Sequence, residues 1–145
     1  MTSGNKSLVQ TIVPLIGAFY VLIGVVGFFA TGFGNFFQQT DDALIGFSVN
    51  PFHNVVHFAI GAFLIIMALN KNKAVGEGAT MGVGLFYVVA FVIGVIGGQN
   101  LSILSMSGVG DLENFNHLIN GVTLLVVGLL SSGATASQAR RRGLA

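Results

Sequence analysis

The sequence predicts an all-α membrane protein, a four-transmembrane-helix bundle built from two tandem parallel helical-hairpin repeats. Three observations support this fold class. Of the 145 residues, 53% are hydrophobic and only 8% are charged, and the mean hydropathy is +0.84, whereas soluble domains carry about 25% charged residues. Four apolar segments approach the roughly 20 residues that a helix needs to cross a bilayer. Two short motifs each occur twice, in the same order.

The predicted transmembrane helices cover residues 8–30, 51–69, 79–97 and 114–130. None of them contains Lys, Arg, Asp or Glu, so each can lie in hydrocarbon without burying a formal charge. In the second, Asn50 followed by Pro51 is typical of a helix cap with proline at the first helical position. Residues 1–145 are predicted to form a single membrane domain that ends in a basic cytoplasmic tail, residues 133–145.

The basic residues predict the orientation of the chain. All six lie in the two terminal tails or in the loop between the second and third spans: Lys6, Lys71, Lys73, Arg140, Arg141 and Arg142. Because basic loops stay on the inner side, we predict a multi-pass protein of the plasma membrane with cytoplasmic N- and C-termini. The expected partners are the lipid bilayer and other membrane-protein subunits. The net charge of +1 argues against nucleic acid.

Two motifs recur along the chain. The first and third spans contain "GAFYV" and "GLFYV", which begin at Gly17 and Gly84. The second and fourth contain Asn-x-x-His-x-x-x-Gly, with its histidines at His57 and His117. The matched positions are 67 residues apart in the first pair of spans and 60 apart in the second. Each half is therefore predicted to be one helical hairpin, with both hairpins running in the same direction.

Polar residues gather near the outer ends of the second and fourth spans. His57 lies six residues after Pro51, about 9 Å along a helix that rises 1.5 Å per residue. His53 precedes His57 by four residues, and Glu113 precedes His117 by four, so each pair shares a helix face. Polar groups at membrane depth face the interior of a bundle. We therefore predict that these side chains meet.

Three interpretations of this meeting remain open. In the first, the polar residues only hydrogen-bond between helices, and the protein is a structural or accessory component of a membrane assembly. In the second, haem b binds to a site formed by His57, His117, Asn54 and Asn114. In the third, a divalent transition metal binds to His53, His57, Glu113 and His117.

Other chemistry finds little support in the sequence. The absence of cysteine excludes thiolate ligands and thiol nucleophiles, and no catalytic motif of the common hydrolase or phosphate-binding types occurs. Proton or solute passage is disfavoured because no predicted span carries a carboxylate in its middle.

The repeated motif resembles that of a family of small bacterial four-helix membrane proteins known as a domain of unknown function. The resemblance is carried by Asn54 and His57 with their echo in "ENFNHLINGV", and it extends over roughly residues 8–132. It implies a four-span fold in the plasma membrane and supplies no activity. His53 and Glu113 lie outside the family motif, which favours the paired-histidine site over the four-ligand metal site.

Overall fold

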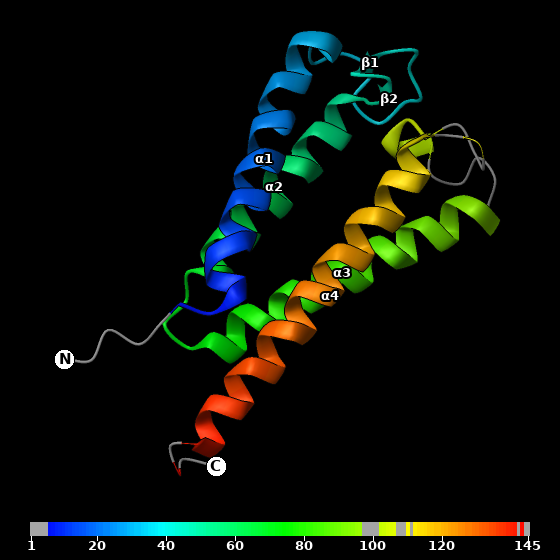
Figure 1. The fold of residues 1–145 in the computed structure, drawn as a ribbon. Helices are drawn as coiled ribbons and strands as arrows, with labels where there is room; N and C mark the ends of the chain where they lie inside the picture. The colour runs from blue at the N-terminus through cyan, green and yellow to red at the C-terminus, as the bar shows by residue number, and fades with distance from the viewer. Residues whose placement is uncertain (1–5, 97–101, 107–109, 111, 142, 144–145) are drawn as a thin grey trace.

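Four long α-helices dominate the computed structural model, which describes residues 6–96, 102–106, 110, 112–141 and 143 (Figure 1). All four are long and apolar enough to cross a membrane, so the chain is a multi-pass membrane protein and the predicted all-α four-helix fold class is confirmed. The helices are α1 (Leu8–Thr31), α2 (Pro51–Ala68), α3 (Lys73–Ile96) and α4 (Leu112–Arg141). A two-stranded hairpin, β1 (Ala43–Leu44) and β2 (Phe47–Ser48), and a 3₁₀ helix, η1 (Ser102–Leu104), lie between them.

Two helices extend beyond the apolar segments that predicted them. α3 begins at Lys73 rather than at residue 79, and α4 continues to Arg141 through most of the segment expected to be a tail. The residues added to α4 include alanines and arginines and no proline, so nothing in them stops a helix. α4 also begins at Leu112, two residues before the predicted span, so the extensions bring Glu77 and Glu113 into helices. Both carboxylates are buried, although hydropathy placed them outside the spans.

Local sequence signals begin the first two helices. Ser7 and Gln10 form a reciprocal capping box at the start of α1. Asn50 caps α2 by accepting a hydrogen bond of 2.8 Å from the backbone N–H of His53, and Pro51 occupies the first turn. The predicted cap at Asn50 is confirmed. It fixes the first turn of α2, from which His53 and His57 project.

The helices pack as two hairpins, α1 with α2 and α3 with α4 (Figure 1). Glycines bring the paired helices close together. A Cβ atom on Gly17 would lie 2.7 Å from the carbonyl oxygen of Gly61, and one on Gly84 would lie 2.9 Å from that of Gly121. Close approach through small residues is the usual basis of helix association in membranes. The same contact at matched positions supports the interpretation of the two hairpins as a tandem repeat.

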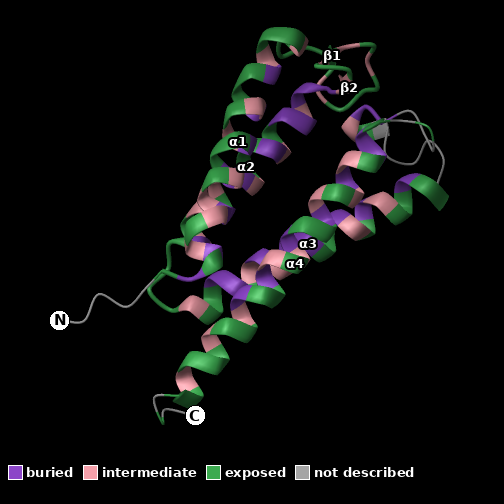
Figure 2. Ribbon diagram, in the orientation of Figure 1, coloured by how far each residue is buried: buried purple, intermediate pink, exposed green. Residues whose placement is uncertain are grey.

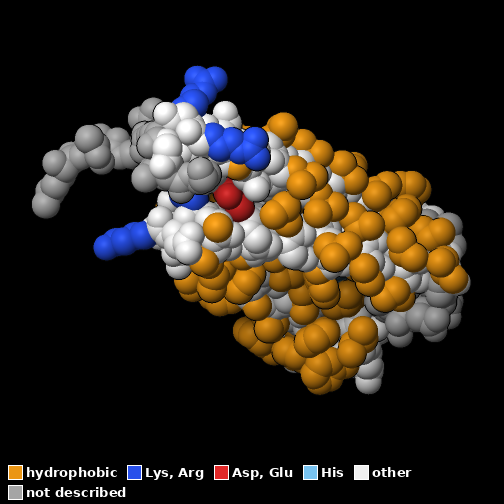
Figure 3. All heavy atoms as spheres, turned by 90° about the horizontal axis from the view of Figure 1, so that it is seen from below, with side chains coloured by type: hydrophobic (Ala, Val, Ile, Leu, Met, Phe, Trp, Pro, Cys, Tyr) orange, Lys and Arg blue, Asp and Glu red, His pale blue; other side chains and the backbone are white. Residues whose placement is uncertain are grey.

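The two ends of the bundle differ in charge. Figure 3 shows Lys and Arg side chains gathered at one end, and hydrophobic side chains over much of the remaining surface in that view. We call this the basic end; α1 begins and α4 ends there (Figure 1). The opposite end, which we call the distal end, carries the β1–β2 hairpin and the starts of α2 and α4 (Figure 1).

The two distal loops are joined to each other by hydrogen bonds. The backbone N–H of Thr40 donates to the Ser105 hydroxyl (3.0 Å), and the Asn50 side-chain amide donates to the carbonyl oxygen of Ile103 (2.8 Å). Because these bonds connect the loop after α1 with the loop after α3, they link the hairpins at the distal end.

The interior of the bundle is mostly apolar, and buried residues line the facing sides of the helices (Figure 2). Its central cluster includes Val13, Tyr20, Leu64, Val83, Tyr87 and Leu124. Two polar groups interrupt this interior. One surrounds Glu113 on the distal side of the cluster, and the other surrounds Glu77 towards the basic end.

Candidate functional site

The first turns of α2 and α4 bring four buried ionisable side chains together. We call this group the distal centre; its members are His53, His57, Glu113 and His117. Each is at most 5% exposed. They include all three histidines of the chain and one of the two carboxylates that are buried in the described residues. In one interpretation, the sequence predicts a metal site formed by these four residues. Two of them, His53 and Glu113, lie outside the family motif, which favoured the paired-histidine site with His57 and His117.

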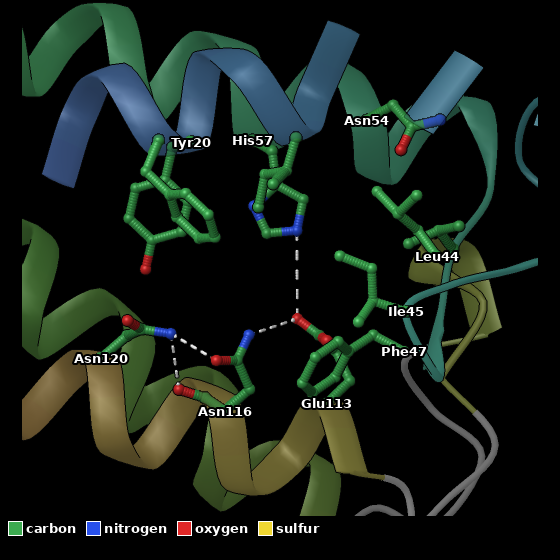
Figure 4. A pocket seen from close by; sticks show the side chains of 12 residues that line it. Tyr20, Leu44, Ile45, Phe47, Asn54, His57, Glu113, Asn116 and Asn120 are labelled. Atoms are coloured by element: carbon green, nitrogen blue, oxygen red, sulfur yellow. Dashed lines mark hydrogen bonds and ion pairs between the residues drawn. The ribbon is translucent and has the colours of Figure 1, made fainter. Parts of the chain in front are cut away.

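A single oxygen atom lies at the middle of the distal centre. Oε1 of Glu113 is 3.6 Å from Nε2 of His53, 3.9 Å from Nε2 of His57 and 3.5 Å from Nε2 of His117. Figure 4 shows His57 and Glu113 pointing towards one another from α2 and α4. Donor atoms of His53, Glu113 and His117 all lie within 4.8 Å of one another. Three imidazoles thus direct the same ring nitrogen at one carboxylate.

Two tyrosines form the apolar side of the distal centre. The Tyr20 ring stacks on His57 with centroids 5.6 Å apart, and the Tyr87 ring lies 5.3 Å from that of His117. The tyrosines also stack on each other at 5.8 Å. Both hydroxyls are buried, and they lie within reach of each other. Aromatic contacts therefore fix the planes of two imidazoles and leave polar atoms beside them.

The motif asparagines support the helices behind the distal centre. The Asn54 amide donates to the Thr31 hydroxyl (2.9 Å) and lies against Gly27, where a Cβ atom would collide with it. Asn114 lies in the same way against Gly94. These two asparagines face the partner helix of their own hairpin. This position suits a packing function and places neither of them among the converging nitrogens.

A short chain of amides runs along α4 from the distal centre. The Asn116 amide donates to Oε1 of Glu113 (3.1 Å), and the Asn120 amide donates to the Asn116 side-chain oxygen (2.7 Å). Figure 4 shows both amides on the side of α4 that faces Tyr20. The Glu113 carboxylate is thus held by its own helix as well as surrounded by imidazoles.

The residues do not fit an axially ligated haem b. In such a site His57 and His117 would approach the iron from opposite faces of a flat macrocycle. Here the Glu113 carboxylate lies between them, within 3.9 Å of one nitrogen and 3.5 Å of the other. That buried carboxylate occupies space that the iron and its ring would need.

Sequence reasoning missed a second buried carboxylate, Glu77 on α3. Its Oε1 accepts hydrogen bonds from the hydroxyls of Ser131 (2.8 Å) and Thr135 (2.7 Å) on α4. Ser131 in turn accepts from the backbone N–H of Val9 (3.3 Å). The heptad spacing from Glu77 to Gly84 and the hydroxyls in "SSGATAS" were available signals, because they place polar groups on two facing helices.

Comparison with known proteins gives one match. The family described as a domain of unknown function (DUF4383) matches residues 10–136, which is most of the chain. Neither a curated protein nor a solved structure matches it.

Proposed function

The chain belongs to the DUF4383 family, whose description names no activity, and from the geometry of the distal centre we propose that it binds a divalent transition metal ion. The observation that supports this proposal is that three imidazole nitrogens lie 3.5–3.9 Å from one buried carboxylate oxygen. Structural hydrogen bonding between helices requires only pairs of groups. The clustering of three ligand atoms within 4.8 Å of one another, with His57 beside them, supports metal coordination over simple pairing.

The separations suit a small coordination sphere. With metal–ligand bonds of about 2.1 Å, a tetrahedral site separates neighbouring ligand atoms by about 3.4 Å. Oε1 of Glu113 lies close to that distance from His53 and His117, and slightly farther from His57. His53, Glu113 and His117 form the tightest set, with ligand atoms within 4.8 Å of one another. An ion bound there would draw these three groups inwards, and His57, whose Nε2 lies 3.9 Å from Oε1 of Glu113, would complete the set.

The donor set selects a class of ion. Imidazole with one carboxylate suits Zn²⁺, Fe²⁺, Mn²⁺ and related ions, whereas Ca²⁺ and Mg²⁺ prefer all-oxygen ligands. A metal ion also lowers the cost of burying Glu113, because its charge offsets that of the carboxylate in a low-dielectric interior.

We propose further that the distal centre faces the outside of the plasma membrane. α3 begins at Lys73 and α4 ends at Arg141, and Lys and Arg side chains gather at the basic end (Figure 3). By the positive-inside rule this end would face the cytoplasm. Both termini are then cytoplasmic. An ion bound at the distal centre would exchange with the outer side.

Binding can be measured on purified protein in detergent after chelator treatment, with Co²⁺ as a spectroscopic probe. We expect one equivalent of Co²⁺ to bind and to give the intense visible bands of tetrahedral cobalt. His53→Ala and His117→Ala should abolish these bands. Glu77→Gln is the matched control, because it alters the other buried carboxylate and should leave them intact.

The opposite result would favour the structural interpretation. In that result the wild type binds no cobalt, and the histidine variants differ from it only in a lower unfolding temperature. The distal centre would then link helices, and the protein would serve as a structural or accessory component. Cobalt bound equally by all variants would also overturn the proposal, because the ion would then lie elsewhere.

A further inference from the structure

We propose that a cavity between α1 and α4 binds the polar ring of a neutral, lipid-soluble molecule of the quinone class, whose apolar tail lies in the bilayer. The cavity has a volume of about 100 Å³ and borders the distal centre (Figure 4). We call it the lateral cavity; the lining residues that carry the argument are Tyr20, Ile45, Phe47, His57, Asn116 and Asn120.

The lateral cavity continues towards the middle of the membrane. A second hollow of about 350 Å³ shares Phe19, Tyr20 and Asn120 with it and extends along the α1–α4 seam to Leu15. Leu15 is 72% exposed and Phe19 is 58% exposed on the lipid-facing surface. A molecule dissolved in the bilayer therefore has an apolar route along this seam to the distal centre.

The closed end of the lateral cavity offers both donors and acceptors. The Tyr20 hydroxyl is buried, lies near the Tyr87 hydroxyl, and points into the space between α1 and α4 (Figure 4). The Asn120 amide and the Glu113 carboxylate border the same space. Both amide hydrogens of Asn120 are donated to Asn116, which leaves its side-chain oxygen as an acceptor. A head with a carbonyl group accepts from the tyrosine hydroxyl, and its hydroxyl form donates to the carboxylate or to the Asn120 oxygen. Quinones and quinols have both kinds of group.

Charge excludes the commonest alternative occupant, an anionic phospholipid headgroup. Among the lining residues that the structure describes, none is Lys or Arg, and the one acidic residue is Glu113. A buried phosphate would therefore lack a counter-charge and would be repelled by the carboxylate. The stacked Tyr20 and His57 rings instead present aromatic edges and faces to a flat, uncharged head.

The β1–β2 hairpin covers the distal side of the lateral cavity. β1 contacts α1 and β2 contacts α4, so the hairpin bridges the two helices that form the seam. Ile45 at its tip has φ +55°, a left-handed conformation that is rare for a β-branched residue. Ile45 and Gly46 (φ +85°) form the two-residue turn that joins the strands, and a turn of this type requires positive φ at both positions. With the hairpin in place, the seam towards the lipid is the open side.

The corresponding seam, between α2 and α3, lacks the two amides of α4. Subtracting the repeat spacing of 60 matches Asn116 with Val56 and Asn120 with Ile60 on α2. The amides thus occur on only one of two otherwise similar helices. They are unnecessary for packing, because α2 packs without them, and this difference supports a ligand on the α1–α4 side.

The absence of tryptophan from the chain permits a direct test with single-tryptophan variants in phosphatidylcholine nanodiscs. Phe19→Trp places the reporter in the seam. Phe86→Trp places it at the matched position of α3, which is 53% exposed and outside the described lining of the lateral cavity. On addition of a decyl-substituted benzoquinone, we expect quenching of the Phe19→Trp protein to saturate at one molecule per chain. Quenching of the Phe86→Trp protein should rise linearly without saturation.

Second substitutions in the Phe19→Trp protein sharpen the test. Asn120→Ile, which copies the residue found on α2, and Tyr20→Phe, which removes only a hydroxyl, should each raise the half-saturating concentration at least tenfold. Unchanged gel-filtration profiles establish that these variants remain folded. Equal, linear quenching of both reporters would overturn the proposal. Displacement of the quinone by phosphatidylglycerol would do so too, because it would identify an anionic-lipid site.

This inference is independent of the proposed metal. His53→Ala removes a metal ligand outside the described lining of the lateral cavity, so saturable quenching should persist when cobalt binding is lost. Asn120→Ile should weaken quinone binding and leave cobalt binding intact. The failure of one proposal is therefore distinguishable from the failure of the other.

Discussion

The two hairpins of the bundle share their packing and differ in their chemistry. Gly17 and Gly84 each admit the partner helix closely, and Tyr20 and Tyr87 each lie against a motif histidine. The position that is His53 on α2 is Glu113 on α4. The comparison separates what the halves share, the packing glycines, the tyrosines and the motif histidines, from the single exchange of His53 for Glu113 that gives the distal centre its carboxylate.

One change between the hairpins has a large electrostatic consequence. If position 113 were histidine, as at position 53, four imidazoles would meet with no carboxylate to offset a bound cation. Glu113 supplies that negative charge and is placed within 3.9 Å of every histidine of the chain. The divergence of the two halves therefore converts a symmetrical polar contact into a set of groups suited to a cation.

The largest expected effect breaks what the hairpins share. Gly17→Leu and Gly84→Leu should each destabilise the protein by about 3 kcal/mol or more, because each side chain would meet the backbone of the facing helix. The unfolding midpoint in detergent measures this. Gly82→Leu is the control, since no atom of a neighbouring element lies within 4 Å of that position. A large difference between Gly17→Leu and Gly84→Leu would show that the hairpins do not pack alike.

The next effect concerns what the hairpins do not share. Glu113→His should weaken cobalt binding at least about 100-fold, because it removes the anionic ligand. His53→Glu in the same chain restores one carboxylate and three imidazoles with the hairpins exchanged. We expect this double variant to recover binding to within about tenfold of the wild type, as measured by cobalt absorbance. No recovery would mean that the amides of α4 are required to hold the carboxylate.

A smaller effect tests the motif asparagines. Asn54→Ala and Asn114→Ala should each cost about 1 kcal/mol of stability, the usual loss for one interhelical polar contact. Both should leave the cobalt bands in place, because neither asparagine points at the distal centre. Equilibrium unfolding and cobalt titration of the same preparations measure the two properties. A loss of cobalt from either variant would assign that asparagine to the metal site.

The smallest effect is expected at Glu77. Its matched residue on α1 is Gln10, so Glu77→Gln makes the halves more alike. The amide oxygen still accepts from Ser131 and Thr135, and we expect cobalt affinity to change less than about twofold. A titration that shows a larger change would indicate that the two buried carboxylates are coupled.

Hydropathy predicted the fold well because a bilayer imposes one length and one polarity on each helix. The match to a family of unknown function confirms the resemblance that the repeated Asn-x-x-His motif indicated. The helices continue beyond the apolar segments, to include Glu77 in α3 and residues 133–141 in α4. Helix formation depends on backbone hydrogen bonds, which continue beyond the apolar segment.

The distal centre was only partly predictable from the sequence. Spacing of four residues placed His53 with His57 and Glu113 with His117 on common faces, but the family motif argued against His53 and Glu113. The tyrosines of "GAFYV" and "GLFYV" were overlooked although they recur at matched positions. The β1–β2 hairpin could not be predicted from the sequence, because strands of two residues are too short to show an alternating hydrophobic pattern.

The apolar cluster between Glu113 and Glu77 has a consequence for traffic across the membrane. Val13, Leu64, Val83 and Leu124 separate the two carboxylates with side chains that offer an ion no ligand. Entering this layer would strip an ion of its hydration shell without replacement. If the distal centre binds a cation as we propose, this layer would insulate it from the basic end, and the ion would leave by the side from which it came.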